Sequence, residues 1–170
     1  MNWLLIGLLG AILYQDFKER AIYAFLPVLL LFFALAKQFY QLGYIQYGFI
    51  GFNLLLLSLQ LVALQLYFLL KNARLYSIVN HEIGLGDLLF FLPLCCLFSP
   101  LQFIFFFIIS LAGSLIAYLL FSNLLGWSKE SIPLAGSMSA FLIFYLLLEQ
   151  WTSFSMYNDS FFFQWIGSLF

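Results

Sequence analysis

Long apolar segments separated by short polar stretches make up almost all of this chain of 170 residues. A helix that spans a bilayer needs about 20 mostly apolar residues, and the pattern predicts six such helices. Their expected ranges are, in chain order, 2–15, 21–36, 44–70, 88–98, 101–121 and 133–149. The pattern therefore predicts an all-α, polytopic membrane helical bundle of about six transmembrane helices.

The apolar run over residues 88–121 is broken by Ser99 and Pro100. As one helix it would be about 50 Å long, whereas the hydrocarbon core of a bilayer is about 30 Å thick. The run is therefore predicted to form a hairpin that turns at Ser99 and Pro100.

Basic residues support the hairpin and set the orientation, because they are enriched in cytoplasmic loops. With six spans and the N-terminus outside, only Lys37 falls on the outer side. The other five fall on the inner side, namely Lys18, Arg20, Lys71, Arg74 and Lys129. A single span over residues 88–121 would move Lys129 outside and weaken this bias.

Composition excludes several classes of protein. With 65% apolar and 8% charged residues, the chain differs from soluble domains, which carry about 25% charged residues. Its apolar content is also too high for a disordered protein. Six Lys and Arg against seven Asp and Glu leave no basic surface for nucleic acid. Residues 1–150 are expected to form the membrane domain and residues 151–170 an aromatic tail at the membrane interface.

Metal or cofactor sites are not expected. The chain has a single histidine, His81, and its two cysteines, Cys95 and Cys96, are adjacent in an apolar run. Two cysteines are too few for a four-cysteine zinc site, so we interpret them as small buried side chains.

Polar and small side chains recur inside the predicted helices. The third helix carries Gln46, Asn53, Gln60 and Tyr67 at seven-residue intervals on one face. They predict hydrogen bonds between helices, with a wet cavity as the alternative. Small residues four apart predict close helix packing; the pairs are Gly7 with Ala11, Ser110 with Ser114, and Gly113 with Ala117.

Two carboxylates, Asp16 and Asp87, stand at the inner ends of predicted helices. The helix over residues 2–15 would be about 21 Å long, shorter than the hydrocarbon core, which draws Asp16 into the membrane boundary. The helix over residues 88–98 is shorter still, so Asp87 is drawn in too. Ionisable groups at such depth are costly and usually functional.

Each aspartate also has a structural interpretation. Asp87 can be the N-cap of the fourth helix, because aspartate is a preferred cap. Asp16 can be an ordinary loop residue paired with Lys18 or Arg20. Two such aspartates on one side of the membrane, with glycines beside one of them, favour a functional role over either interpretation.

Three short motifs carry a resemblance to a known family. The sequence G-L-G-D at residues 84–87 is similar to the G-x-G-D motif of intramembrane aspartic proteases. The sequence D-F-K-E-R-A-I at residues 16–22 resembles the first-aspartate motif of the type IV prepilin peptidases, and I-P-L-A-G at residues 132–136 resembles their Ile-Pro segment. Motif order, spacing and the six-span layout resemble that family over nearly the whole chain.

The resemblance implies a membrane aspartic endopeptidase in the inner (cytoplasmic) membrane, with Asp16 and Asp87 as the catalytic pair at the cytoplasmic side. Its implied partner is a membrane-inserted prepilin or pseudopilin-like precursor, whose basic leader is removed just before its hydrophobic helix. Gly84 and Gly86 have no side chains, so they let a substrate strand approach Asp87.

The chain also departs from the family pattern. Tyr23 and Ala24 follow the first motif where many members have Pro-Asn, and Leu89 stands where many have Lys. It lacks the N-terminal cytoplasmic domain of the bifunctional members, so it resembles the short, peptidase-only form and we expect no methyltransferase activity. Two alternatives stay open, a catalytically silent scaffold subunit and a small ion- or proton-coupled transporter.

Helix polarity suggests how two carboxylates would divide the work of acid and base. Asp87 begins a helix, where the dipole favours a negative charge, and Asp16 ends one, where the dipole disfavours it. The hypothesis is that Asp87 is the ionised base and Asp16 the protonated acid. The small residues 135–137 are expected either to leave room beside the site or to allow close packing of helices. Glu19, Glu82 or Glu130 is expected to receive the basic leader of the substrate.

Overall fold

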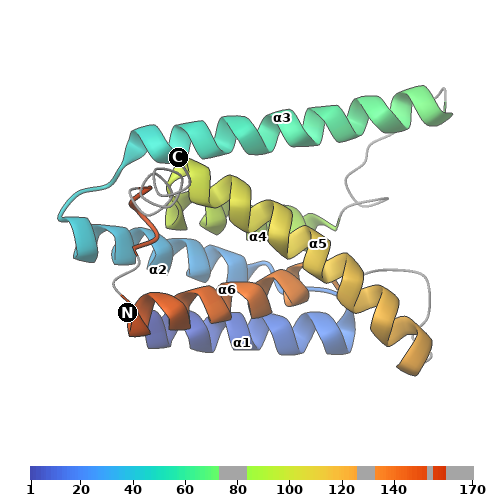
Figure 1. Cartoon of the computed structure of the whole chain (residues 1–170), viewed down its shortest axis with the longest axis horizontal. Coiled ribbons are helices and arrows are strands. Elements are labelled where there is room, and N and C mark those ends of the chain that lie inside the picture. Colours follow the sequence, from blue (N-terminus) through green and yellow to red (C-terminus); the bar gives the residue numbers. More distant parts are fainter. Residues whose placement is uncertain (73–83, 126–132, 153–154, 160–170) are drawn as a thin grey trace, which may run out of the picture.

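The computed structural model describes residues 1–72, 84–125, 133–152 and 155–159, and every regular element in these ranges is an α-helix (Figure 1). The prediction of an all-α bundle is confirmed. The helices are α1 (Asn2–Glu19), α2 (Phe25–Leu42), α3 (Tyr47–Asn72), α4 (Leu85–Leu97), α5 (Pro100–Leu125) and α6 (Leu134–Trp151).

Four of these helices, α2, α3, α5 and α6, are long and apolar enough to cross a membrane. Helix α4 is apolar but has only 13 residues. Helix α1 has 18 residues and carries three charged side chains near its end, those of Asp16, Lys18 and Glu19. Length and composition therefore support a membrane-embedded bundle, with four candidate spans among the described helices.

The predicted hairpin is confirmed at Ser99 and Pro100. Helix α4 ends at Leu97, and Phe98 has an extended backbone that redirects the chain into α5. The side-chain amide of Asn53 on α3 donates hydrogen bonds to the carbonyls of Cys95 (3.1 Å) and Phe98 (2.8 Å). Asn53 thus makes the predicted hydrogen bond between helices, whereas Tyr67, which was predicted to share that role, is 55% exposed.

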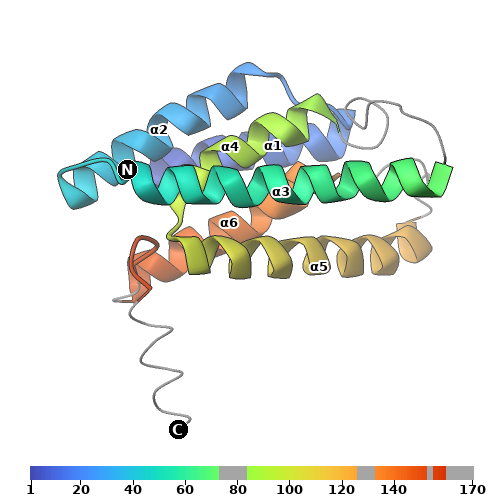
Figure 2. The same ribbon diagram turned by 90° about the horizontal axis from the view of Figure 1, so that it is seen from above.

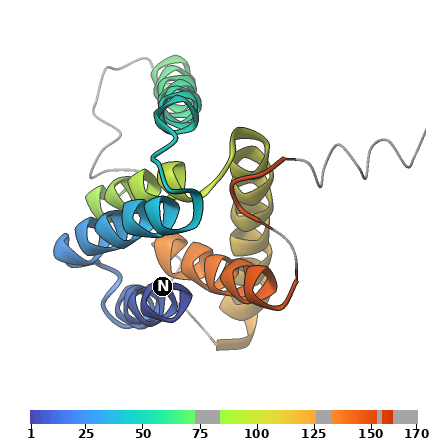
Figure 3. The same ribbon diagram turned by 90° about the vertical axis from the view of Figure 1, so that its left-hand side faces the viewer.

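The helices pack in two main pairs. Helix α1 lies along α6 (Figure 1) and α2 lies along α4 (Figure 2), and these four helices contribute Leu9, Leu94 and Leu142 to the core. The end-on view shows α3 at the periphery (Figure 3), where it contacts α4 and α5. Cys95 and Cys96 lie in this core, as predicted.

The small-residue pairs have different outcomes. A Cβ atom at Gly113 would overlap the ring of Phe141 on α6, so α5 and α6 approach closely there, as predicted. Ser137 also donates a hydrogen bond to Ser114 (2.7 Å) across the same two helices. The prediction was wrong for Gly7, which is exposed and has no atom near its Cβ position, because that face of α1 points out of the bundle.

The sequence pattern predicted that the second helix ends before Lys37, and this prediction was wrong. Helix α2 begins at Phe25 and continues to Leu42, where Gly43 closes it with a left-handed backbone (φ 77°). Lys37 lies inside the helix with 0% of its surface exposed, and its Nζ is 2.5 Å from a carboxylate oxygen of Glu149 on α6. It is therefore a buried, paired charge and not a loop charge.

Part of the C-terminal tail packs onto the bundle. The side chains of Met156 and Tyr157 are buried, and the Lys37 ammonium lies 5.6 Å from the centre of the Tyr157 ring. Ser99 donates a hydrogen bond to Asp159 (2.5 Å). The short segment 155–159 is thereby attached to the end of the bundle at which α4 ends and α5 begins.

Candidate active site

Asp16 lies in the last turns of α1, which runs on to Glu19 and not to residue 15 as predicted. Arg20 ends this helix in a left-handed conformation (φ 51°), and its N–H donates to the Asp16 carbonyl (3.0 Å). The Asp16 side chain is only 5% exposed. Its carboxylate accepts a hydrogen bond from the backbone N–H of Gly136 on α6 (2.6 Å), so Asp16 is not a solvated loop residue.

Asp87 is the third residue of α4, and Gly84 holds the N-cap position. The alternative in which Asp87 is this cap is therefore wrong. At this position an acidic side chain can accept from the N–H of the cap residue, and the Asp87 carboxylate accepts such a bond from Gly84. It also accepts a hydrogen bond from the N–H of Ala135 on α6 (3.1 Å).

The two aspartates therefore meet at the first turn of α6. The first N–H groups of a helix have no partner within the helix, and two consecutive ones, of Ala135 and Gly136, point at the two carboxylates. The end of α1 and the starts of α4 and α6 lie at the same end of the bundle (Figure 1). The positive end of the α6 dipole thus faces both acidic groups.

At Gly136, α6 packs tightly against α1 beside Asp16. A Cβ atom there would lie 2.9 Å from a carboxylate oxygen of Asp16 and 2.9 Å from the Phe17 ring. Without a side chain at Gly136, the carboxylate can reach the backbone of α6. Of the two expectations for the small residues 135–137, the structure has close packing at Gly136.

The two glycines before Asp87 have different surroundings. A Cβ atom at Gly86 would lie 3.2 Å from the Cβ of Ile22, so Gly86 packs against the segment that joins α1 to α2. Gly84 is exposed, and its Cβ position lies 3.2 Å from a carboxylate oxygen of Asp87. Gly84 is thus the exposed glycine of the two, and it lies directly beside the Asp87 carboxylate.

Burial changes the acidity of both carboxyl groups, which lie outside the four long apolar helices. It raises the pKa of Asp16, while the Gly136 N–H and the Arg20 charge lower it. Burial, followed by the charge of Asp16, raises the pKa of Asp87 to about 6, against the lowering effect of its backbone hydrogen bonds. Like charges that repel in this way favour a pair that shares one proton.

This geometry favours the reverse of the acid–base hypothesis drawn from helix polarity. That hypothesis compared the end of α1 with the start of α4, but both carboxylates bind the start of α6. Asp16 has the shorter bond to α6 and is stabilised by Arg20, whereas Asp87 is destabilised as an anion by Asp16. Asp16 is therefore the better candidate for the ionised member of the pair, which titrates as a unit.

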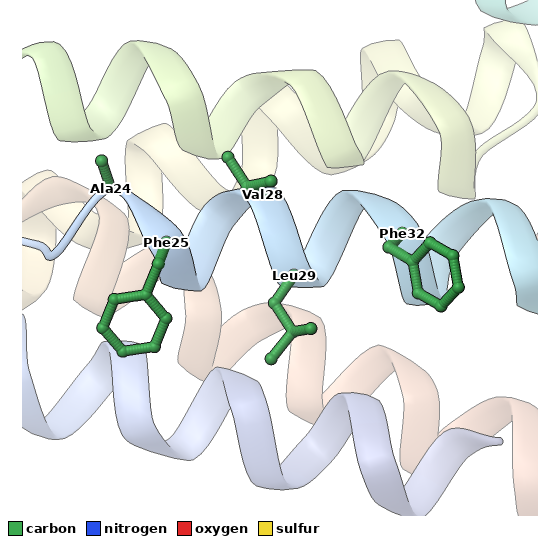
Figure 4. A pocket seen from close by; sticks show the side chains of 5 residues that line it. All are labelled: Ala24, Phe25, Val28, Leu29 and Phe32. Atoms are coloured by element: carbon green, nitrogen blue, oxygen red, sulfur yellow. The ribbon is translucent and has the colours of Figure 1, made fainter.

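An apolar groove runs along the outer face of α2 from Ala24 to Phe32 (Figure 4). Its lining side chains are all apolar, so it cannot supply acid or base chemistry. In the described part of the chain, no three metal-ligating side chains come together. Among the described residues, the polar groups gathered at this end of the bundle include the two carboxylates and the backbone amides that bind them.

One of the three glutamates expected to receive a basic leader, Glu19, lies within the described residues. Glu19 is exposed at the end of α1, while Glu82, Glu130 and His81 lie outside the described residues. The N–H groups of Ala135 and Gly136 were not predicted as part of the site, although the I-P-L-A-G motif contains both residues. Comparison with known protein families, curated proteins and solved structures finds no match to this chain.

Proposed function

We propose that this chain is a membrane-embedded aspartic endopeptidase that removes the basic leader from type IV prepilin or pseudopilin-like precursors. The observation that supports it is the meeting of Asp16 and Asp87 at consecutive N–H groups of α6. Aspartic proteases catalyse peptide hydrolysis with two carboxyl groups that share one proton. The inner membrane and a cytoplasmic site are part of the proposal.

In the proposed reaction, the ionised Asp16 takes a proton from a water molecule as its oxygen attacks the carbonyl carbon of the scissile peptide bond. Asp87 supplies the proton that the departing amine needs when the C–N bond breaks. The products are a new carboxyl group on the leader and a new amino group on the mature protein. A hydrogen bond from α6 occupies one oxygen of the Asp16 carboxylate, and a carboxylate has a second oxygen that can accept from water.

The test is co-expression with a precursor pilin, followed by separation of precursor and mature forms. Asp16→Asn and Asp87→Asn should each abolish leader removal at normal protein levels. Asp159→Asn is the matched control, because this carboxylate binds Ser99 at the opposite end of α4. Undiminished cleavage by either dyad variant would reject the proposal.

A catalytically silent scaffold subunit is the second candidate, and one observation favours it. Each aspartate satisfies a free N–H group at the start of α6, which a purely structural carboxylate would also do. In that case the wild-type protein would leave the precursor uncut.

A further inference from the structure

Gln15 is a buried polar residue beside Asp16 that the proposed reaction does not use. Its side chain is 7% exposed, and its carbonyl oxygen accepts a hydrogen bond from the backbone N–H of Tyr23 (3.4 Å). Its amide nitrogen is buried and has no hydrogen-bond partner among the described residues. A buried donor without a partner is unfavourable, so its presence needs an explanation.

The contacts of Gln15 link it to the segment that packs beside Asp87. Tyr23, which binds its carbonyl oxygen, follows Ile22 in the segment that joins α1 to α2. Ile22 packs against Gly86, the residue before Asp87. The side chain of Gln15 therefore connects the Asp16 end of α1 to the segment that supports the first turn of α4.

Gln38 makes the same local contact at the other end of the bundle. It is 1% exposed, and its carbonyl oxygen accepts a hydrogen bond from the backbone N–H of Gln46 (3.3 Å). Gln46 follows Gln38 by eight residues, the same separation as that between Gln15 and Tyr23. Holding the following turn is thus common to both glutamines. Of the two, Gln15 is the one with a buried, unpartnered amide nitrogen.

We propose that the side-chain amide of Gln15 donates a hydrogen bond to a backbone carbonyl of the bound substrate next to the scissile bond. This inference rests on the proposed peptidase function. The missing partner of Gln15 must be an acceptor, and an uncharged peptide carbonyl adds no third negative charge beside Asp16 and Asp87. Substrate binding would then satisfy a donor that the free protein leaves unpaired.

The experiment measures kcat, KM and thermal unfolding of purified variants in detergent with a precursor pilin as substrate. Gln15→Met removes both the donor and the acceptor without adding charge. Gln15→Glu keeps the acceptor for Tyr23 and removes the donor. Gln38→Met is the control, because it removes the same turn contact far from the aspartates.

Both Gln15 variants should lower kcat/KM roughly tenfold, the equivalent of one hydrogen bond, with the larger part in kcat. Gln38→Met should cleave as the wild type does, although it should unfold at a temperature as reduced as that of Gln15→Met. Wild-type kcat/KM in both Gln15 variants, or an equal loss in Gln38→Met, would overturn the inference. The aspartate variants separate failure of this inference from failure of the peptidase proposal. If they still cleave, the peptidase proposal fails; if they do not cleave but both Gln15 variants do, only the inference about Gln15 fails.

Discussion

The carboxylates of Asp16 and Asp87 accept hydrogen bonds from neighbouring backbone N–H groups in a single turn of α6, at 2.6 and 3.1 Å. Both acidic groups are therefore fixed by the same rigid element. A shift of α6 along its axis would move the hydrogen-bond donors of both carboxylates together. The start of α6 is thus as important for the pair as the helices that carry the aspartates.

Gly136→Ala tests this dependence. The new Cβ would lie 2.9 Å from both the Asp16 carboxylate and the Phe17 ring, so α1 and α6 must separate. We expect loss of leader cleavage and a destabilisation of about 1–3 kcal/mol, as for other overpacked sites. The measurements are the cleavage assay and thermal unfolding in detergent.

Gly51→Ala is the control for that variant. Gly51 also lies within a helix, but no atom lies within 4 Å of its Cβ position. Alanine favours helix by up to about 1 kcal/mol over glycine, so this variant should be at least as stable as the wild type and equally active. Full activity of Gly136→Ala would show that the contact between α1 and α6 does not hold the pair.

The pH dependence of cleavage should follow the shared proton. Because burial and the Asp16 charge raise the pKa of Asp87 to about 6, the singly protonated pair is lost as the pH rises past that value. We expect kcat/KM to fall on the alkaline side from about pH 6. Arg20→Gln should move the acidic limb to higher pH, because the Arg20 charge lowers the pKa of Asp16. An unchanged acidic limb in this variant would contradict the assignment of Asp16 as the ionised member.

Stability should depend on pH in the opposite sense from that of a salt-bridged aspartate. The folded pKa of Asp87, about 6, lies above its ordinary value of 3.8, so the folded state binds the proton more tightly. Its contribution is complete below pH 3.8 and is lost as the pH rises through 6. At pH 8 Asp87→Asn should therefore be more stable than the wild type, by up to about 3 kcal/mol, as judged by thermal unfolding at pH 4 and pH 8.

The sequence predicted the helices well because bilayer thickness constrains apolar runs. The hairpin at Ser99 and Pro100 follows from length alone, and it is present. Helix ends were less predictable. Helix α1 includes Asp16 and continues to Glu19, because Arg20 adopts the left-handed backbone that closes it, and an arginine gives no sequence signal for that conformation.

The site was predicted only through its side chains. Asp16 and Asp87 stand out as acidic residues beside apolar runs, but the groups that bind them are backbone N–H groups of Ala135 and Gly136, and every residue except proline has such a group. Lys37 was misplaced for a related reason. Its partner Glu149 is far along the chain, so a charge that looks like a helix boundary in the sequence is paired inside the fold.

The pairing of Lys37 with Glu149 leads to the last prediction. Lys37 is 0% exposed and Glu149 is 9% exposed, and Asn2 also donates a hydrogen bond to Glu149 (3.3 Å). Removing one member leaves a buried charge without its partner, which typically destabilises a protein by about 3–5 kcal/mol. Lys37→Met and Glu149→Gln should each lower the unfolding temperature markedly.

The double variant Lys37→Met/Glu149→Leu separates pairing from packing. A buried ion pair can often be replaced by apolar side chains of similar size without loss of stability, so the double variant should recover most of what each single variant loses. Cleavage per folded molecule should stay near the wild-type value, because this pair joins α2 to the end of α6 remote from Ala135 and Gly136. If the double variant is as unstable as the sum of the two single ones, the two charges do not depend on each other.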